Sequence, residues 1–210
     1  MNKSIAKLFR VLPKLKRNYY IYWNRLFFRL LGINFGKNMK VFNKVYVMGN
    51  GHITIGDNLV CRSGDGLNAL SRNIRGIFFT DSKGIIKIGD NVGMSSVCLW
   101  SKESITIGHN VNIGADSLII DTDAHPHDFV QRRRSFKQQM GEVRYEDYIP
   151  SAPIVIEDDA WIGSRCQVLK GVCIGARSII AAGSVVNKSI PSDVIAGGVP
   201  CKVIKKISEN

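Results

Sequence analysis

The sequence lacks any acidic residue in its first thirty positions, where eight lysines and arginines occur. It also lacks a CxxC pair, and its five cysteines leave one over from any disulfide pairing. No stretch reaches the roughly eighteen uncharged apolar residues of a membrane span, and bases interrupt the region where a secretory signal would need an apolar core. These absences argue against a disulfide scaffold, a signal peptide and a spanning helix. They favour a reducing, cytoplasmic location, with a peripheral position at the inner membrane as a further option.

The composition is that of a globular protein with an unusual charge. The 210 residues are 45% apolar and 22% charged, which is enough for one large domain with a substantial core. The formal net charge of +12 attracts polyanions such as anionic lipid, phosphorylated metabolites or nucleic acid. Because the bases concentrate near the N-terminus and no known nucleic-acid motif occurs, we expect no nucleic-acid partner.

The N-terminal region has apolar residues at helical spacing. They recur every three or four positions between bases, as Ile5, Leu8, Phe9, Leu12, Leu15, Tyr19, Tyr22, Trp23, Leu26, Phe27, Leu30 and Leu31. This spacing predicts an amphipathic helix over about 4–32, interrupted near Pro13 and ended by Gly32 and Gly36. The helix either packs its aromatic stripe on the rest of the domain or rests, through residues 1–32, on an anionic membrane. We therefore predict an N-terminal basic amphipathic helical segment over 1–35.

The remainder of the chain repeats with a period of six. β-Branched aliphatics recur at every sixth position, as Ile156, Ile162, Val168, Ile174, Ile180 and Val186, and glycine follows several of them. A period of six cannot keep one face of an α-helix apolar, but it suits short strands joined by corners, with three units per coil. The pattern predicts an all-β domain over 36–210 that is a parallel β-helix with inward-facing aliphatics.

One long departure interrupts the repeat. Residues 126–153 leave the stack as a loop of 28 residues, and the coil resumes at Ile154 in register with the Ile156 series. Loops this long inside a compact domain are usually functional. The sequence leading into the loop is Thr122-Asp123-Ala124-His125-Pro126, where His125 falls at a first position that an aliphatic would normally fill. We expect His125 to end the stack at the point where the loop leaves it.

These motifs together resemble those of a known family. The tandem hexapeptides, the His-Pro step at His125-Pro126, Ala160-Trp161-Ile162-Gly163 and the closing run AAGSVVNKSIPSDVIAGGVPCKVIK are similar to the left-handed β-helix acyltransferases. Within them, the galactoside and maltose O-acetyltransferases and the bacterial surface-polysaccharide O-acetyltransferases are most alike. The resemblance covers about residues 40–206. It implies a left-handed β-helix, a homotrimer, acetyl-CoA as co-substrate, a saccharide acceptor and a reaction that needs no metal.

The resemblance implies that His125 is the general base. An imidazole that titrates near neutral pH can take the proton of a sugar hydroxyl as the hydroxyl attacks the thioester. His127 is the alternative, as a ligand of the acceptor or without a role. Asp121 and Asp123 either orient the imidazole, contact acceptor hydroxyls or only form the turn. Arg132, Arg133 and Arg134 either bind a phosphate or acidic sugar or form a solvated face.

The resemblance also implies a binding site for acetyl-CoA. Its residues by motif would be Trp161, Ser164, Ala182, Asn187, Lys188, Lys202 and Lys205. Trp161 would flank the thioester, and Ser164 and Ala182 would bind the pantetheine arm. The two C-terminal lysines stand where related sugar acetyltransferases often have arginine, so the charge is kept while the bidentate fork is lost.

The acceptor and the reaction class leave alternatives. Met94 or Ser95 stands where galactoside acetyltransferases have an acceptor-binding asparagine, which predicts an acceptor other than a simple galactoside. The second interpretation is an N-acetyltransferase of a nucleotide-linked amino sugar. A non-catalytic β-solenoid would explain the repeat but not the His-Pro loop. A β-helical carbonic anhydrase would need three zinc-binding histidines with an H-x-x-x-x-H pair, which this chain lacks.

Overall fold

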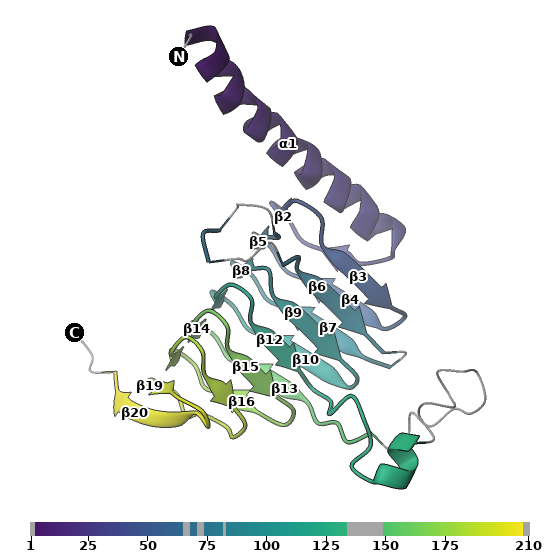
Figure 1. The fold of residues 1–210 in the computed structure, drawn as a ribbon, viewed down its shortest axis with the longest axis vertical. Coiled ribbons are helices and arrows are strands. Elements are labelled where there is room, and N and C mark those ends of the chain that lie inside the picture. The colour runs from purple at the N-terminus through teal and green to yellow at the C-terminus, as the bar shows by residue number, and fades with distance from the viewer. Residues whose placement is uncertain (1–2, 65–67, 71–73, 82, 134–148, 208–210) are drawn as a thin grey trace.

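The computed structural model describes residues 3–64, 68–70, 74–81, 83–133 and 149–207, with side chains from residue 15 onward. The chain begins with helix α1 (Lys3–Leu30) and continues as three sheets that wrap around one core (Figure 1). Sheet A contains β1 (Asn34–Phe35), β4 (His52–Ile55), β7 (Ile85–Ile88), β10 (Ser104–Ile107), β13 (Ile154–Ile156) and β16 (Cys173–Ile174). Sheet B contains β2 (Lys40–Phe42), β5 (Val60–Arg62), β8 (Gly93–Ser95), β11 (Asn112–Ile113), β14 (Trp161–Ile162), β17 (Ile179–Ile180), β19 (Val194–Gly197) and β20 (Lys202–Lys206). Sheet C contains β3 (Tyr46–Gly49), β6 (Ile77–Thr80), β9 (Cys98–Ser101), β12 (Leu118–Ile120), β15 (Gln167–Leu169) and β18 (Val185–Val186).

Each coil contributes one strand to each sheet, as the period of six predicts. Strand β10 pairs in parallel with β7 on one side and β13 on the other, and Ile107 aligns with both Ile88 and Ile156. The six-spaced aliphatics stack inside the prism and are fully buried: Ile156, Ile162, Val168, Ile174, Ile180 and Val186. The predicted parallel β-helix is therefore confirmed. Among the strands of the described residues, only β20 runs antiparallel, and it closes the last coil against β19.

The corners between strands rely on asparagine in the left-handed backbone region. Four asparagines with φ between 56° and 60° occupy the corner between sheets A and B: Asn38, Asn58, Asn91 and Asn110. Their amides form a ladder along the stack, with Nδ2 to Oδ1 distances of 3.1, 2.8 and 3.0 Å. Asparagine tolerates this conformation better than most residues and also supplies both a donor and an acceptor.

Glycine is required where consecutive corners touch. A Cβ built on Gly163 would lie 2.5 Å from the backbone N of Ala182 and 2.7 Å from its Cα. We expect Gly163→Ala to lower the free energy of unfolding by about 1–3 kcal/mol, because rigid backbone would have to move. Gly76→Ala is the matched control, since its Cβ would meet nothing closer than 3.6 Å. Equal denaturant midpoints for the two variants would contradict this account.

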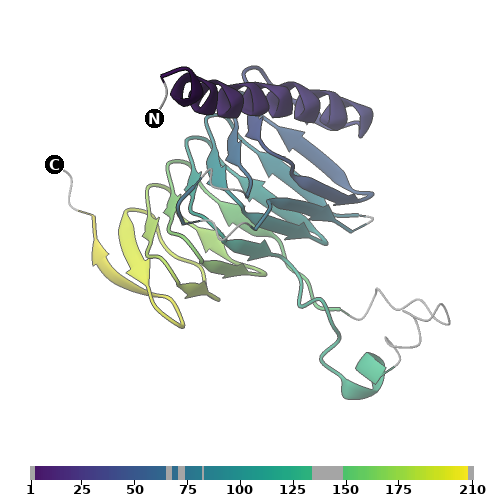
Figure 2. The same cartoon turned by 45° about the horizontal axis from the view of Figure 1, so that its top comes forward.

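Helix α1 packs across the first coil at the end of the stack opposite the C-terminal strands (Figures 1 and 2). The buried Asn24 amide donates to the carbonyls of Val41 and Asn43 at 3.1 and 2.9 Å. Phe28 is fully buried, and its ring centroid lies 6.4 Å from that of Phe78. These contacts fix the C-terminal half of the helix on the core.

The predicted ends of the helix are only partly correct. The helix runs without a break through Pro13, so the expected interruption is wrong; the one hydrogen bond that proline removes does not outweigh the helix-forming residues on both sides. The helix ends as predicted at Gly32, whose φ is +71°, and the Ile33 N–H donates to the Phe28 carbonyl at 2.9 Å. Strand β1 then lies inside the segment expected to be helical, so the first coil begins at Asn34.

The aromatic stripe of α1 faces away from the core. Among the stripe residues whose side chains the structure describes, Phe27 is partly buried against the core. The others have large exposed fractions: Leu15, Tyr19, Tyr22, Trp23, Leu26, Leu30 and Leu31. Among the described side chains, the stripe therefore packs on the domain only in part, through Phe27. Within the described part of the chain, α1 is too polar to cross a bilayer, and the structure holds no other candidate helix.

Candidate functional site

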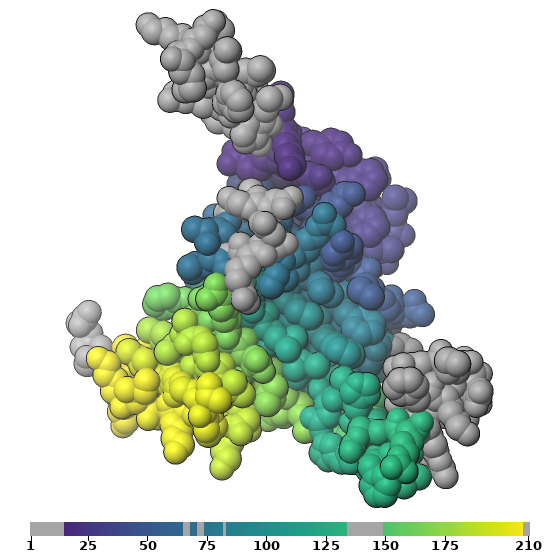
Figure 3. Space-filling view, viewed as in Figure 1, coloured from purple at the N-terminus to yellow at the C-terminus, as the bar shows by residue number. Residues whose placement is uncertain are grey.

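The long loop leaves the stack at the corner between sheets C and A. Its two arms are paired at the base, where Thr122 forms an antiparallel bridge with Ser151. The Asp123 N–H donates to the Pro150 carbonyl and the Ala152 N–H donates to the Asp121 carbonyl, both at 2.9 Å. We call residues 121–127 and 149–152 the loop neck. Beyond the neck, the chain projects from the side of the stack and forms a helical turn over residues 129–133 (Figures 1 and 3).

Asp121 anchors the loop neck from inside. It is fully buried, and its carboxylate accepts the backbone N–H groups of Lys102 and Glu103 at 2.6 and 2.9 Å and the Ser101 hydroxyl at 2.9 Å. Burial raises the pKa of Asp121, and these hydrogen bonds oppose the rise by stabilising the carboxylate. Because its oxygens are engaged by neighbouring backbone, Asp121 acts as a structural anchor and does not face an acceptor.

His125 lies at the outer surface of the loop neck. The chain leaves the coil after Ile120, so the sixth position beyond Ile119 no longer faces the core. His125 therefore lies where the loop leaves the stack, as expected, and its side chain is exposed. A left-handed Ala124, with φ of 59°, turns the backbone, and the His125 N–H donates to the Asp123 carbonyl at 2.7 Å. This turn presents the imidazole to solvent at the edge of sheet C.

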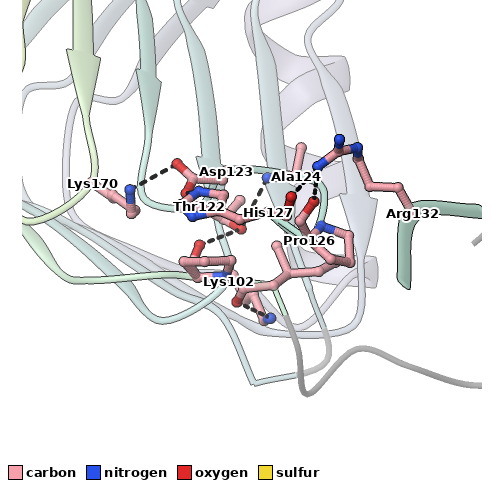
Figure 4. Close-up of polar contacts among 10 residues, drawn as sticks. Lys102, Thr122, Asp123, Ala124, Pro126, His127, Arg132 and Lys170 are labelled. Carbon is pink, nitrogen blue, oxygen red and sulfur yellow. Dashed lines mark hydrogen bonds and ion pairs between the residues drawn. The ribbon is translucent and has the colours of Figure 1, made fainter. Parts of the chain in front are cut away.

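The neighbouring His127 and Asp123 form a polar cluster with Lys170 (Figure 4). Asp123 Oδ2 lies 2.5 Å from His127 Nε2, and Asp123 Oδ1 accepts from Lys170 Nζ at 2.8 Å. Partial burial favours the neutral acid, but the hydrogen bonds from Lys170 and His127 prevail and hold the pKa of Asp123 below its usual value. Lys170 was missed in the sequence analysis. Ile120 pairs with Leu169, so Lys170 lies one coil beyond the point where the loop leaves the stack. That position was the signal that could have identified it.

The lowered pKa of Asp123 gives a pH-dependent contribution to stability. A carboxyl group with a depressed pKa stabilises the fold above its unfolded pKa, and this stabilisation is lost as the pH falls through its folded value. We expect Asp123→Asn to lower the unfolding free energy by about 0.5–1 kcal/mol at neutral pH, and by progressively less below about pH 4. Denaturant titrations across that range check this. A difference that grows toward acid pH would contradict it.

The loop arginines contact the loop itself. Arg132 donates from a terminal guanidinium nitrogen to the Pro126 carbonyl at 2.9 Å and also to the His127 carbonyl. The Arg133 guanidinium lies 5.3 Å from the centre of the Phe129 ring. Arg134 lies outside the described residues. In this structure Arg132 therefore braces the turn that carries the two histidines.

The structure divides the predicted acetyl-CoA residues between two edges of sheet C. Ser164 and Ala182 stack in the corner between sheets B and C, where the Gly183 N–H donates to the Ser164 carbonyl at 2.8 Å. Asn187 and Lys188 follow β18 and therefore occupy the opposite corner, between sheets C and A, on the side of His125. Within one chain, the full width of sheet C separates the proposed base from the Ser164 corner.

The other predicted cofactor residues lie on or beside sheet B. Trp161 is 55% exposed on the outer face of β14, between Asn112 and Ile179. Lys202 and Lys205 are exposed on β20, and Lys202 pairs with Gly197 at the end nearest the Ser164 corner. An exposed tryptophan and two cations thus lie on the same side of the stack as Ser164.

The two positions proposed for the acceptor are buried. Met94 is 2% exposed and packs in the core, aligned with Ile113 and Cys61, so the prediction that its side chain contacts an acceptor is wrong. Ser95 is 6% exposed, and its hydroxyl accepts from the Asn68 amide at 3.0 Å. In the described residues, no group of three or more His, Cys, Asp or Glu side chains is placed to hold a metal ion.

A three-sheet parallel β-helix with a histidine-bearing loop neck places the chain among the hexapeptide-repeat proteins. Residues 153–188 match the bacterial transferase hexapeptide model, which describes six repeats. The chain is 33% identical over 168 residues to WbbJ of Escherichia coli, assigned to lipopolysaccharide biosynthesis as an O-acetyl transferase, with 77% of this chain and 75% of WbbJ covered. The chain belongs to the hexapeptide-repeat acetyltransferase family, whose fold is the left-handed β-helix.

Two further relatives concern sugar acetylation. The galactoside O-acetyltransferase of Escherichia coli is 39% identical over 106 residues, which cover 50% of this chain and 46% of that protein. A galactoside acetyltransferase solved with coenzyme A superposes with a TM-score of 0.52 at 25% identity, over 99% of this chain and 84% of the other. The matched segments thus cover from about half to three quarters of the curated relatives' length.

One solved structure supports the fold alone. The N-acyltransferase AntD of Bacillus cereus, solved with coenzyme A and dTDP-4-amino-4,6-dideoxyglucose, superposes with a TM-score of 0.61 at 21% identity. The superposition covers 88% of this chain and 90% of AntD.

Proposed function

We propose that this protein transfers an acetyl group from acetyl-CoA to a hydroxyl of a saccharide, and that the acceptor is a surface-polysaccharide or lipid-linked sugar. The WbbJ relative supports the polysaccharide assignment, and the galactoside acetyltransferase relatives support sugar acetylation with coenzyme A. The observation that carries the proposal is the exposed His125 at a braced loop neck, in a chain that belongs to this family.

His125 is the proposed general base. Its imidazole accepts the proton of the acceptor hydroxyl while the oxygen attacks the thioester carbonyl carbon of acetyl-CoA. The carbon–sulfur bond then breaks, and the coenzyme A thiolate leaves and takes up the proton. The step needs acceptor and donor together in one ternary complex, and it needs no covalent enzyme intermediate. Asp123 and His127, at the same neck, are the proposed acceptor contacts.

We propose that the complete site forms between subunits of a homotrimer. His125 and the Ser164 corner occupy opposite edges of sheet C, so a second chain packed against sheet C would bring the two edges together. The outer face of that sheet is mostly apolar along its aligned strands. One row is Met48, Phe79, Trp100, Ile120 and Leu169, and the next is Tyr46, Ile77, Cys98, Leu118, Gln167 and Val185. The outer face of sheet A presents polar side chains such as Thr54, Lys87 and Thr106. This contrast favours sheet C as the subunit contact.

The donor site proposed for acetyl-CoA is a groove along this contact. Ser164 and Ala182 offer backbone groups to the amides of the pantetheine arm, and Trp161 flanks the thioester. Asn187, Lys188, Lys202 and Lys205 are the proposed contacts for the phosphate end, where cations and amide donors match its charge.

We also propose that the N-terminal helical segment serves peripheral membrane contact and that the β-helix, which begins at Asn34, forms the catalytic domain. The exposed stripe of α1 supports this division, because it is left uncovered by the β-helix. Such a contact would hold the enzyme beside a lipid-linked acceptor.

A transfer assay with radiolabelled acetyl-CoA tests the reaction. Free and lipid-linked oligosaccharides are compared with a nucleotide-linked amino sugar, and the products are treated with mild base, which cleaves esters but leaves amides. Base-labile label on the saccharides is the expected result. Base-stable label on the amino sugar alone would replace the proposal with N-acetylation.

A further inference from the structure

A basic hollow lies between α1 and the first coil, outside the proposed transfer site. It has a volume of about 420 Å³ and is lined by Arg25, Arg29, Phe35, Lys37 and Asp57 among others. Arg25 Nε donates to the Met39 carbonyl at 3.0 Å, and the Arg29 guanidinium lies 5.3 Å from the centre of the Phe35 ring. Asp57 is engaged by the Lys37 backbone N–H at 2.6 Å. Three cations against one carboxylate leave the hollow positive, and the two arginines are held in place.

An exposed apolar seam runs along α1 beside this hollow. It consists of Leu15, Tyr19, Tyr22, Trp23, Leu26 and Leu30, whose exposure rises to 69% at Tyr22 and 77% at Leu30. Helix residues three or four apart are surface neighbours, so Tyr22 and Leu26 lie next to Arg25 and Arg29. The buried Asn24 and Phe28 define the opposite face, which holds the helix to the stack. The seam therefore points away from the body of the protein.

The charge distribution decides what covers the seam. Packing against the same helix of a second copy would bring arginines and lysines together, and no acidic residue occurs in the first thirty positions to pair with them. Tyrosine and tryptophan, whose rings are apolar but carry one polar group, favour the boundary between lipid head groups and acyl chains. An apolar seam flanked by cations is complementary to an anionic lipid surface and not to itself.

We propose that α1 docks on an anionic phospholipid surface, with the phosphate of one head group bound in the hollow by Arg25, Arg29 and Lys37. The seam inserts at the head-group boundary, and the β-helix projects into the aqueous phase. This inference rests on the membrane contact proposed above and is independent of the transfer chemistry. Because α1 lies across one end of the stack (Figure 2), a lipid surface there would leave the loop neck on the side of the stack accessible.

Vesicle binding by the 210-residue chain tests the hollow. Vesicles of phosphatidylcholine alone are compared with vesicles that also contain phosphatidylglycerol, and only the latter should bind. Removing two cations with Arg29→Gln and Lys37→Gln should weaken that binding by about 30-fold. The pair Lys83→Gln and Lys87→Gln makes the same charge change away from α1 and should bind like the wild type. Equal losses in both pairs, or equal binding to both kinds of vesicle, would refute a specific hollow.

A second variant separates the lipid surface from other occupants of α1. Tyr22→Ser with Leu26→Ser alters only exposed side chains and should reduce vesicle binding at least tenfold while leaving the oligomeric state and the transfer to a soluble saccharide unchanged. If it instead lowers the oligomeric state and spares vesicle binding, the seam is a subunit contact. If inorganic phosphate at constant ionic strength binds the hollow while vesicle binding stays unchanged, the hollow holds a free anion and not a lipid head group. Either outcome overturns the proposal.

Discussion

The variant His125→Ala should retain its fold and its oligomeric state but lose about 10²- to 10⁴-fold in the rate of acetyl transfer, the range that a positioned general base contributes. The imidazole is exposed at the loop neck, so truncation leaves no buried cavity. The loss should appear in kcat with little change in the affinity for acetyl-CoA. Initial rates with a saturating saccharide, together with binding of the coenzyme, measure both quantities.

Two histidine variants serve as controls for this result. His52→Ala removes an exposed imidazole on β4, two strands away from β10 in sheet A, and should leave the rate unchanged. His127→Ala removes a partner of Asp123 and should reduce activity by much less than His125→Ala. If His127→Ala were the more damaging variant, the base would be His127, held by Asp123 and Lys170 in the manner of an oriented imidazole. A wild-type rate for His125→Ala would end its assignment as the base.

The core of this fold was predictable because its period is strict. A six-residue unit fixes which side chain faces inward in every coil, and burial of one aliphatic per unit leaves little freedom for the register. The same count would have corrected one site prediction. Met94 lies six residues after Ile88 and is therefore a core position, yet motif similarity placed it at the acceptor. The physical period was the better guide there.

The period fails where the chain leaves the coil. His125 is six residues after Ile119, but the strand ends at Ile120 and the loop arms pair with each other, so no coil remains to define an inward side. Lys170 was missed because the spacing gives only its position, one coil beyond the loop exit. Its contact with Asp123 depends on the reach of a long side chain in the folded chain. The sequence also could not predict that most of the α1 stripe is exposed, because an amphipathic pattern does not show which helix face packs on the protein.

The division of the proposed site is a consequence of three units per coil. Ser164 and Ala182 are eighteen residues apart and therefore share a corner, whereas Asn187 and His125 fall at the next corner. The spacing alone therefore predicts that the proposed site residues lie at two different corners. Only the strand pairing shows that sheet C lies between those two corners. This arrangement accounts for the apolar outer face of sheet C. The sheet separates the two parts of the proposed site within one chain, and a contact through it would bring parts from two chains together.

Leu118→Glu should therefore abolish both assembly and activity. Leu118 lies at the middle of the outer face of sheet C, between Cys98 and Gln167, and a carboxylate there would be desolvated without a partner in a packed interface. We expect the protein to sediment as a folded monomer and the transfer rate to fall at least about 100-fold, since each site would lack one of its two edges. Sedimentation analysis and initial rates on the same sample measure the two effects.

Thr106→Glu provides the matched control, because it places the same charge on the outer face of sheet A, between Lys87 and Val155. It should leave both assembly and rate unchanged. The loss in Leu118→Glu should also lessen as protein concentration rises, since mass action opposes dissociation. A monomeric Leu118→Glu protein with a normal rate would show that one chain holds the whole site. A fully assembled Leu118→Glu protein would show that another surface joins the subunits.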